Sequence, residues 1–121
     1  MCLSVITKTI DHPTDDERIA WKLFEHPFAG GRRDLVGPHY SVAGGELDDR
    51  PWPRGQWLKA EVTNIYPPGY DSGFHCYRSR AEARSSVGHE FVVRVLVRRV
   101  KYEGRQDGRR VLVADELFIP E

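Results

Sequence analysis

The stretch that decides the fold is FVVRVLVRRVKY at 91–102, followed by EGRQDG at 103–108 and RVLVADELFI at 110–119. In an extended chain, Phe91, Val93, Val95 and Val97 share one face, and Arg94 and Arg98 share the other with Val92 and Leu96. The glycine-containing segment between the two apolar runs is typical of a turn over 103–108. The stretch therefore predicts an antiparallel hairpin over about 90–119, with one face in the core and the other partly in water.

Residues 73–83 predict a sharp strand-to-helix junction just before this hairpin. Phe74 to Tyr77 suits a short strand. Ser79 and Glu82 have the spacing of a capping box, in which the serine accepts the Glu82 N–H and the carboxylate reaches back. We expect a short helix over about 79–87, closed by Gly88.

Period-two alternation predicts further strands over 3–8, 19–25 and 56–65. Residues 66–70 form a Pro- and Gly-containing turn signal. Residues 26–55 carry repeated Gly and Pro breakers and predict a long irregular loop, a feature that is often functional in a compact domain. The expected class is α+β, mainly an antiparallel β-sheet or a partly open barrel with one short helix.

The chain has 121 residues, which suits one domain over 1–121. It has 18 basic and 18 acidic residues, so it lacks the basic excess typical of generic duplex nucleic-acid binding. No apolar run reaches the roughly 20 residues of a membrane span. No secretory signal and no CxxC pair is seen, and we expect a cytoplasmic protein with reduced thiols. The sequence leaves the oligomeric state open.

Basic residues gather in one part of the chain. From Gly73 to Arg110 there are nine arginines and Lys101 against four acidic residues, a local excess of six. This pattern fits a basic face for an acidic partner. It fits equally well the solvated faces of strands.

Three residues are candidates for catalysis: His75, Tyr77 and Glu116. His75 and Tyr77 lie on one strand face, whereas His75 and Cys76 point to opposite faces and cannot act as a base–nucleophile pair. Cys2 has the position of an N-terminal nucleophile or, alternatively, of a buried structural thiol. The histidines and cysteines have no metal-ligand spacing, so no metal is expected.

A cluster of aromatic side chains with nearby arginines suggests a pocket for a flat ligand. Alternatively, the same aromatic residues form the rim of the core. Trp52, which lies between two prolines, is expected to be exposed. The candidate ligand-binding residues are Trp52, Arg54, Trp57, Tyr70, His75, Tyr77 and Arg78.

Four segments together resemble a group of small, poorly characterised phage and bacterial proteins. They are the Met-Cys-Leu start, Trp21-Lys22-Leu23, the 73–77 strand with the 79–83 helix, and the Val-rich hairpin. The 73–83 junction is also similar to ADP-ribosyltransferase-like domains, in which such a segment lies beside the NAD site. That resemblance implies a late-strand catalytic glutamate, which Glu116 could provide. This chain lacks the family's first-strand Arg or His.

These observations favour a binding module, an accessory protein of phage or prophage type that engages a protein partner or a small ligand through the 27–55 loop and the 73–77 strand. A first alternative is a small enzyme that uses NAD or a nucleotide; otherwise no cofactor is expected. A second alternative is a structural subunit whose hairpin edge pairs with a neighbour.

Overall fold

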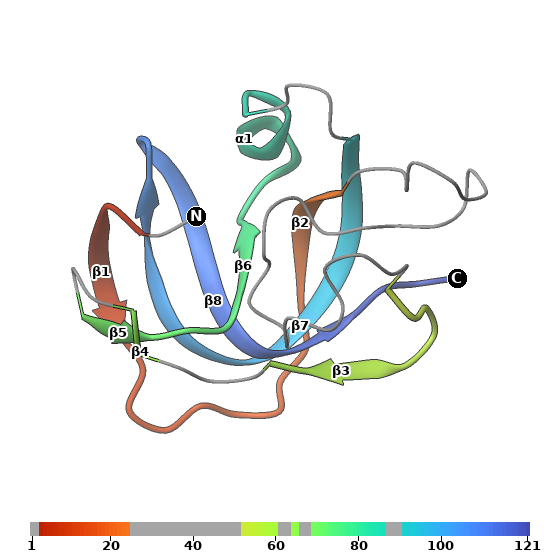
Figure 1. Ribbon diagram of the computed structural model, residues 1–121, viewed down its shortest axis with the longest axis horizontal. Coiled ribbons are helices and arrows are strands. Elements are labelled where there is room, and N and C mark those ends of the chain that lie inside the picture. The colour runs from red at the N-terminus through yellow and green to blue at the C-terminus, as the bar shows by residue number, and fades with distance from the viewer. Residues whose placement is uncertain (1–2, 25–51, 61–63, 66–68, 87–90) are drawn as a thin grey trace.

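The computed structural model describes residues 3–24, 52–60, 64–65, 69–86 and 91–121 of the chain. Within these ranges the fold is α+β, with antiparallel strands and one short helix, as the sequence predicted (Figure 1). The elements in chain order are β1 (Val5–Thr9), β2 (Arg18–Phe24), β3 (Trp57–Lys59), β4 (Asn64–Ile65), β5 (Tyr70–Asp71), β6 (Phe74–Tyr77), α1 (Arg80–Arg84), β7 (Phe91–Gln106) and β8 (Arg109–Phe118).

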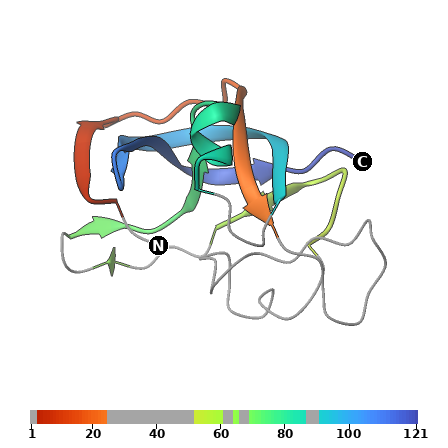
Figure 2. The same ribbon diagram turned by 90° about the horizontal axis from the view of Figure 1, so that it is seen from above.

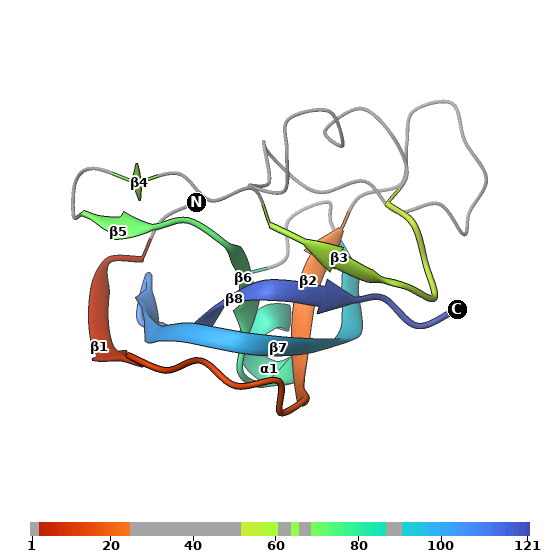
Figure 3. The ribbon, with the colours of Figure 1, turned by 90° about the horizontal axis from the view of Figure 1, so that it is seen from below.

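The main sheet closes partly on itself around the β7–β8 hairpin. β7 pairs with β8 along one edge and with β2 and β1 along the other, and β6 lies between β2 and β8. A single residue pair, Trp21 with Tyr77, joins β2 to β6. The outcome is a partly ringed sheet, in which β3 lies beside β8 near the C-terminal end of the chain (Figure 3).

The hairpin turns at only two residues. Asp107 and Gly108 have φ angles of 52° and 79°, the left-handed pair that suits a two-residue hairpin turn. β7 runs on to Gln106, which pairs with Arg109, so the prediction of a longer turn over 103–108 was wrong. Residues 103–105 stay extended because they pair with β1 on the far edge of β7 as well as with β8.

A β-bulge interrupts β7 near its middle. The register with β8 shifts between Val100 and Tyr102, and Arg99 has a φ of 58°. An extra residue of this kind bends a strand and redirects side chains. The side chain of Lys101, within the bulge, is buried and forms an ion pair with Asp115 at 2.7 Å.

Among the described residues, the core contains two apolar clusters separated by the sheet. Alternate residues of β6 and β8 enter different clusters: Phe74 and Leu112 belong to the larger, Tyr77 and Val113 to the smaller. The helix α1 contributes Ala83 to the smaller cluster. Figure 2 shows α1 close to β2 and β6, where it covers this cluster.

Most predicted elements form, with shifted ends. The strand predicted over 19–25 is confirmed by β2, and the helix ends at Arg84 rather than near 87. The first strand begins at Val5, because Leu3 is buried in the smaller cluster. Of the strand predicted over 56–65, Trp57–Lys59 forms β3 and 64–65 form β4, whereas 61–63 lie outside the described residues. The same holds for the candidate Cys2, for residue 25 of the strand predicted over 19–25, and for Gly88 at the predicted end of the helix. It also holds for 26–51 of the predicted loop, for 66–68 of the predicted turn and for residue 90 of the predicted hairpin.

Gly104→Ala tests the close approach of β1 to β7. A Cβ atom at Gly104 would lie 2.3 Å from the backbone oxygen of Val5, so β1 must move away. We expect unfolding in urea to require about 1–3 kcal/mol less free energy. The amides of β1 should exchange hydrogen faster.

The matched control is Gly108→Ala, where a Cβ atom meets nothing within 4 Å and the only cost is the positive φ. Faster exchange in β1 of the Gly108 variant, or none in the Gly104 variant, would contradict this packing.

Candidate functional site

His75, the first catalytic candidate, is held in a buried hydrogen-bonded chain. Its Nδ1 lies 3.0 Å from the Gly73 carbonyl oxygen, and its Nε2 lies 2.9 Å from the Tyr70 hydroxyl. A carbonyl only accepts, so Nδ1 carries the proton and Tyr70 donates to Nε2. The Tyr70 oxygen in turn accepts the Leu3 N–H at 2.9 Å. Every polar atom of the imidazole is therefore used in joining the N-terminal segment to β5 and β6.

The environment of His75 keeps the ring neutral. Burial, together with the nearby charge of Lys22, lowers the pKa of His75 to about 4. Both ring nitrogens already have partners, and the side chain is only 8% exposed. This arrangement suits a structural histidine that connects two segments of the chain.

Lys22 is a buried amine that the sequence did not single out. It projects from β2 into the larger cluster, donates to the His75 carbonyl at 3.0 Å and lies 5.7 Å from the centre of the Trp52 ring. Burial lowers its pKa. For Cys76, burial has the opposite effect: it raises the pKa of the thiol to about 11, because the charged form is the thiolate. The thiol is therefore protonated at neutral pH.

Trp52 is a core residue, and the expectation that it is exposed was wrong. The side chain is 3% exposed and lies edge-on to Phe24 at 5.3 Å and to Phe74 at 5.8 Å between ring centres. Burying a large aromatic side chain between two others outweighs the exposure suggested by the flanking prolines.

Glu116 is engaged by Arg98, which donates to its carboxylate at 2.8 Å and 3.1 Å. The Arg98 guanidinium also lies 4.0 Å from the centre of the Trp57 ring. This carboxylate therefore supports the β3–β8–β7 junction. Its partners differ from those of His75, so the catalytic candidates are not joined in one hydrogen-bonded set.

The remaining predicted ligand-binding residues are also engaged within the fold. Tyr77 is 5% exposed in the smaller cluster. Arg78 forms an ion pair with Glu103 at 3.2 Å, and Arg54 donates to the Pro120 carbonyl. The seven predicted residues thus lie in several different environments within the described part of the chain.

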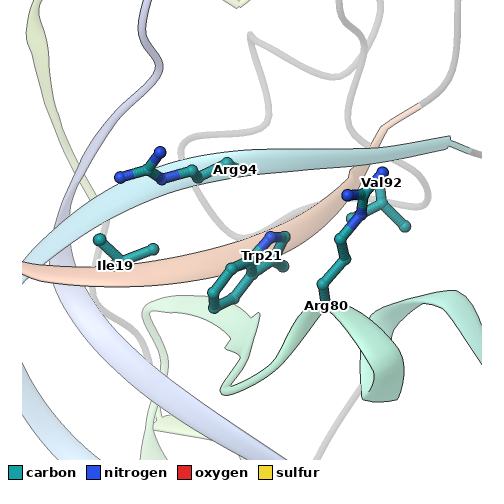
Figure 4. Close-up of a pocket in the computed structure, with 5 residues that line it drawn as sticks. All are labelled: Ile19, Trp21, Arg80, Val92 and Arg94. Carbon is teal, nitrogen blue, oxygen red and sulfur yellow. The ribbon is translucent and has the colours of Figure 1, made fainter.

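A groove that was not predicted lies on the outer face of β2 and β7, next to α1. It has a volume of about 370 Å³, within the range of small-ligand pockets, and we call it the Trp21 groove (Figure 4). Trp21 and Val92 form an apolar floor against the smaller cluster, and Ile19 is 44% exposed beside them. Arg80 from α1 and Arg94 from β7 are exposed at its sides.

Neither of the two groove arginines has a partner among the described residues. Among the described arginines, only Arg80, Arg84 and Arg94 lack an ion pair or hydrogen bond to the rest of the described chain. Two of these three line the same groove. A guanidinium with no internal partner is free to bind a carboxylate or phosphate.

A clamp at the start of α1 positions Arg80. The Ser79 hydroxyl accepts the Glu82 N–H at 3.1 Å, as the predicted capping box requires. The carboxylate of Glu82 reaches back and accepts a hydrogen bond from the Ser79 hydroxyl at 2.9 Å. It also binds Arg110 on β8, accepting both its backbone N–H and its guanidinium, which was not predicted. Burial would raise the pKa of Glu82, but these bonds and the one from Ser79 hold it at about 2. The first turn of α1 is thereby fixed to β8.

Some sequence signals for the groove were present. The basic excess over 73–110 includes Arg80 and Arg94, and Arg94 was placed with Val92 on the outer face of its strand. The partner strand was missing from that pattern: Trp21 meets Arg94 only because β2 pairs in register with β7. Pairing of strands some 70 residues apart is not visible in a local pattern.

Within the described ranges, no three His, Cys, Asp or Glu side chains are grouped so as to hold a metal ion. The helix found in this part of the structure is too short to span a bilayer. Comparisons of the chain with protein-family models, curated proteins and solved structures find no match. The resemblances to phage proteins and to ADP-ribosyltransferase-like domains remain predictions.

Trp52→Ala should destabilise the protein by about 3–5 kcal/mol, because it removes a buried indole from between two phenyl rings. Urea denaturation measures this loss. Trp57→Ala is the matched control, since Trp57 is only half-buried and should cost clearly less. An unchanged melting curve for the Trp52 variant would place this side chain on the surface.

The neutral state of His75 makes stability depend on pH. Below about pH 6.5 the unfolded chain takes up a proton on this residue, whereas the native protein resists protonation down to about pH 4. Stability contributed by His75 is therefore complete above pH 6.5 and is lost as the pH falls toward 4, by roughly 3 kcal/mol in total.

His75→Gln removes this titration and should flatten the stability curve between pH 6.5 and 5, a window that lies above the ordinary Glu82 pKa of 4.5. Chemical denaturation at pH 7, 6 and 5 measures both slopes. Equal slopes for the variant and the original protein would show that His75 titrates normally.

Proposed function

We propose that the protein is a binding module whose Trp21 groove receives a ligand or partner with an anionic group next to an apolar or aromatic one. The observation that carries this proposal is the pair Arg80 and Arg94, which have no partner in the described chain and flank an apolar floor. Arginine binds carboxylates and phosphates through two parallel hydrogen bonds, and the floor supplies apolar contact.

Exposed arginines are commonly solvated, and that is the simplest alternative explanation. The other arginines argue for more than solvation in this case. Arg78, Arg98, Arg99 and Arg110 on the same fold each find a carboxylate partner. No carboxylate lies among the residues that line the groove. The groove therefore carries two guanidinium groups and no carboxylate among the residues that line it.

A binding role also agrees with the predicted accessory role of phage or prophage type. The 73–77 strand does not offer the contact surface, since its side chains are buried. The alternative of an enzyme that acts on NAD or a nucleotide draws support from the same groove, because an indole and two arginines can bind a base and a phosphate. The two alternatives differ in what binds and whether it is converted.

The test is a binding series with three probes: AMP, NAD and a labelled hexapeptide that alternates aspartate with leucine. Arg80→Ala and Arg94→Ala should each weaken the probe that binds by about tenfold or more, the effect of losing a charged hydrogen bond. Isothermal calorimetry measures the Kd. Turnover of NAD, followed by chromatography, would favour the enzyme.

Arg84→Ala is the matched control, since Arg84 is exposed on the same helix, has no described partner and does not line the groove. It should leave binding unchanged. Equal weakening by the Arg84 variant would indicate attraction to net charge alone, and failure of all three probes to bind would overturn the proposal.

A further inference from the structure

We infer that the Trp21 groove is one half of a two-part site, and that its occupant is an extended acidic segment of a partner protein lying along β7. This inference rests on the proposed function and specifies its partner. The observation behind it is a second hollow of about 380 Å³, lined by Arg94, Val95, Leu96 and Pro120. Arg94 lines both hollows, so they meet at this side chain.

The two hollows lie on one continuous face. Arg94 and Leu96 are two residues apart on β7, so their side chains project to the same side. Ile19, which lines the first hollow, pairs directly across from Leu96, which lines the second. The apolar floor therefore passes from one hollow to the other without a break.

The length of this floor favours an extended occupant. From Val92 to Leu96 the strand advances four residues, or about 13 Å at the usual rise. A peptide in extended form covers that distance with about four residues, whereas one mononucleotide is accommodated by a single hollow.

The charge of the face selects an acidic occupant. Arg80 at one end and Arg94 at the centre are the charged residues among those lining the two hollows, and both are positive. Acidic residues of the partner would meet these guanidiniums while its apolar residues contact Trp21 and Leu96. Arg94, shared by both halves, should matter most to binding.

The experiment compares probes that need one hollow with a probe that needs both. The probes are AMP and the labelled hexapeptide of alternating aspartate and leucine, with its lysine–leucine counterpart as the charge control. The protein should bind the acidic peptide and not the basic one. Leu96→Glu and Pro120→Glu, which place a negative charge in the second hollow only, should weaken the acidic peptide about tenfold or more.

Pro120→Glu protects the test against misfolding, because Pro120 is exposed and its known contact is through its backbone carbonyl to Arg54. Two further outcomes separate this inference from the proposed function. In the first, AMP binds in an Arg94-dependent way and the peptide does not bind. In the second, the peptide binds with the same affinity to the original protein and to both second-hollow variants. Either result would overturn the two-part site but leave the proposed function of the Trp21 groove intact.

If neither probe binds, both proposals fail. Size-exclusion chromatography covers the remaining occupant: self-association that is abolished by Arg94→Ala would identify a second copy of the chain as the partner and overturn the inference.

Discussion

The fold depends on the length of β7, whose sixteen residues provide pairing edges for three other strands. β8 occupies one edge, and β2 and β1 follow each other along the opposite edge. Antiparallel pairing thus covers 96–106 of β7 on the β8 side, and 91–97 and 102–105 on the opposite side. Among the described strands of the main sheet, the free edges belong to β1 and β3.

Several polar groups are buried in this sheet, and each serves a particular connection. Tyr70 and His75 tie the N-terminal segment to β6, and Lys101 enters through a bulge to reach Asp115. Lys22 donates to a strand carbonyl from inside the larger cluster. A buried polar group is costly unless it has a partner, so each of these bonds favours one arrangement of strands over its alternatives. In this fold, His75, Lys22 and Lys101, which are residue types common in active sites, form hydrogen bonds or ion pairs that connect strands.

The same logic marks the Trp21 groove as different. Its two arginines have no ion pair or hydrogen bond within the described fold, and they lie beside partly exposed apolar side chains. Charge and apolar area in one place are typical of a recognition surface. The groove therefore differs from the buried histidine network in its polar partners: the groove arginines have none within the described fold, whereas both ring nitrogens of His75 are hydrogen-bonded.

The outcome of the individual predictions follows from the range over which each signal acts. The β7–β8 hairpin, the strand at 19–25 and the Ser79 cap were predicted because alternation and capping depend on residues close together in sequence. The exposure of Trp52 was mispredicted, and the bond between the Glu82 carboxylate and Arg110 was not predicted. Both depend on partners from distant strands: Phe24 and Phe74 for Trp52, and Arg110 for Glu82.

By itself the sequence determined the fold class, the hairpin and the helix start, since local backbone preference and side-chain alternation act within a few residues. The tertiary structure alone decided that β2 lies beside β7 in the register that brings Trp21 to Arg94. It also decided that Arg80 reaches the same groove from α1. The physical reason is that long-range strand pairing is selected by the packing of the whole core, which no local pattern specifies.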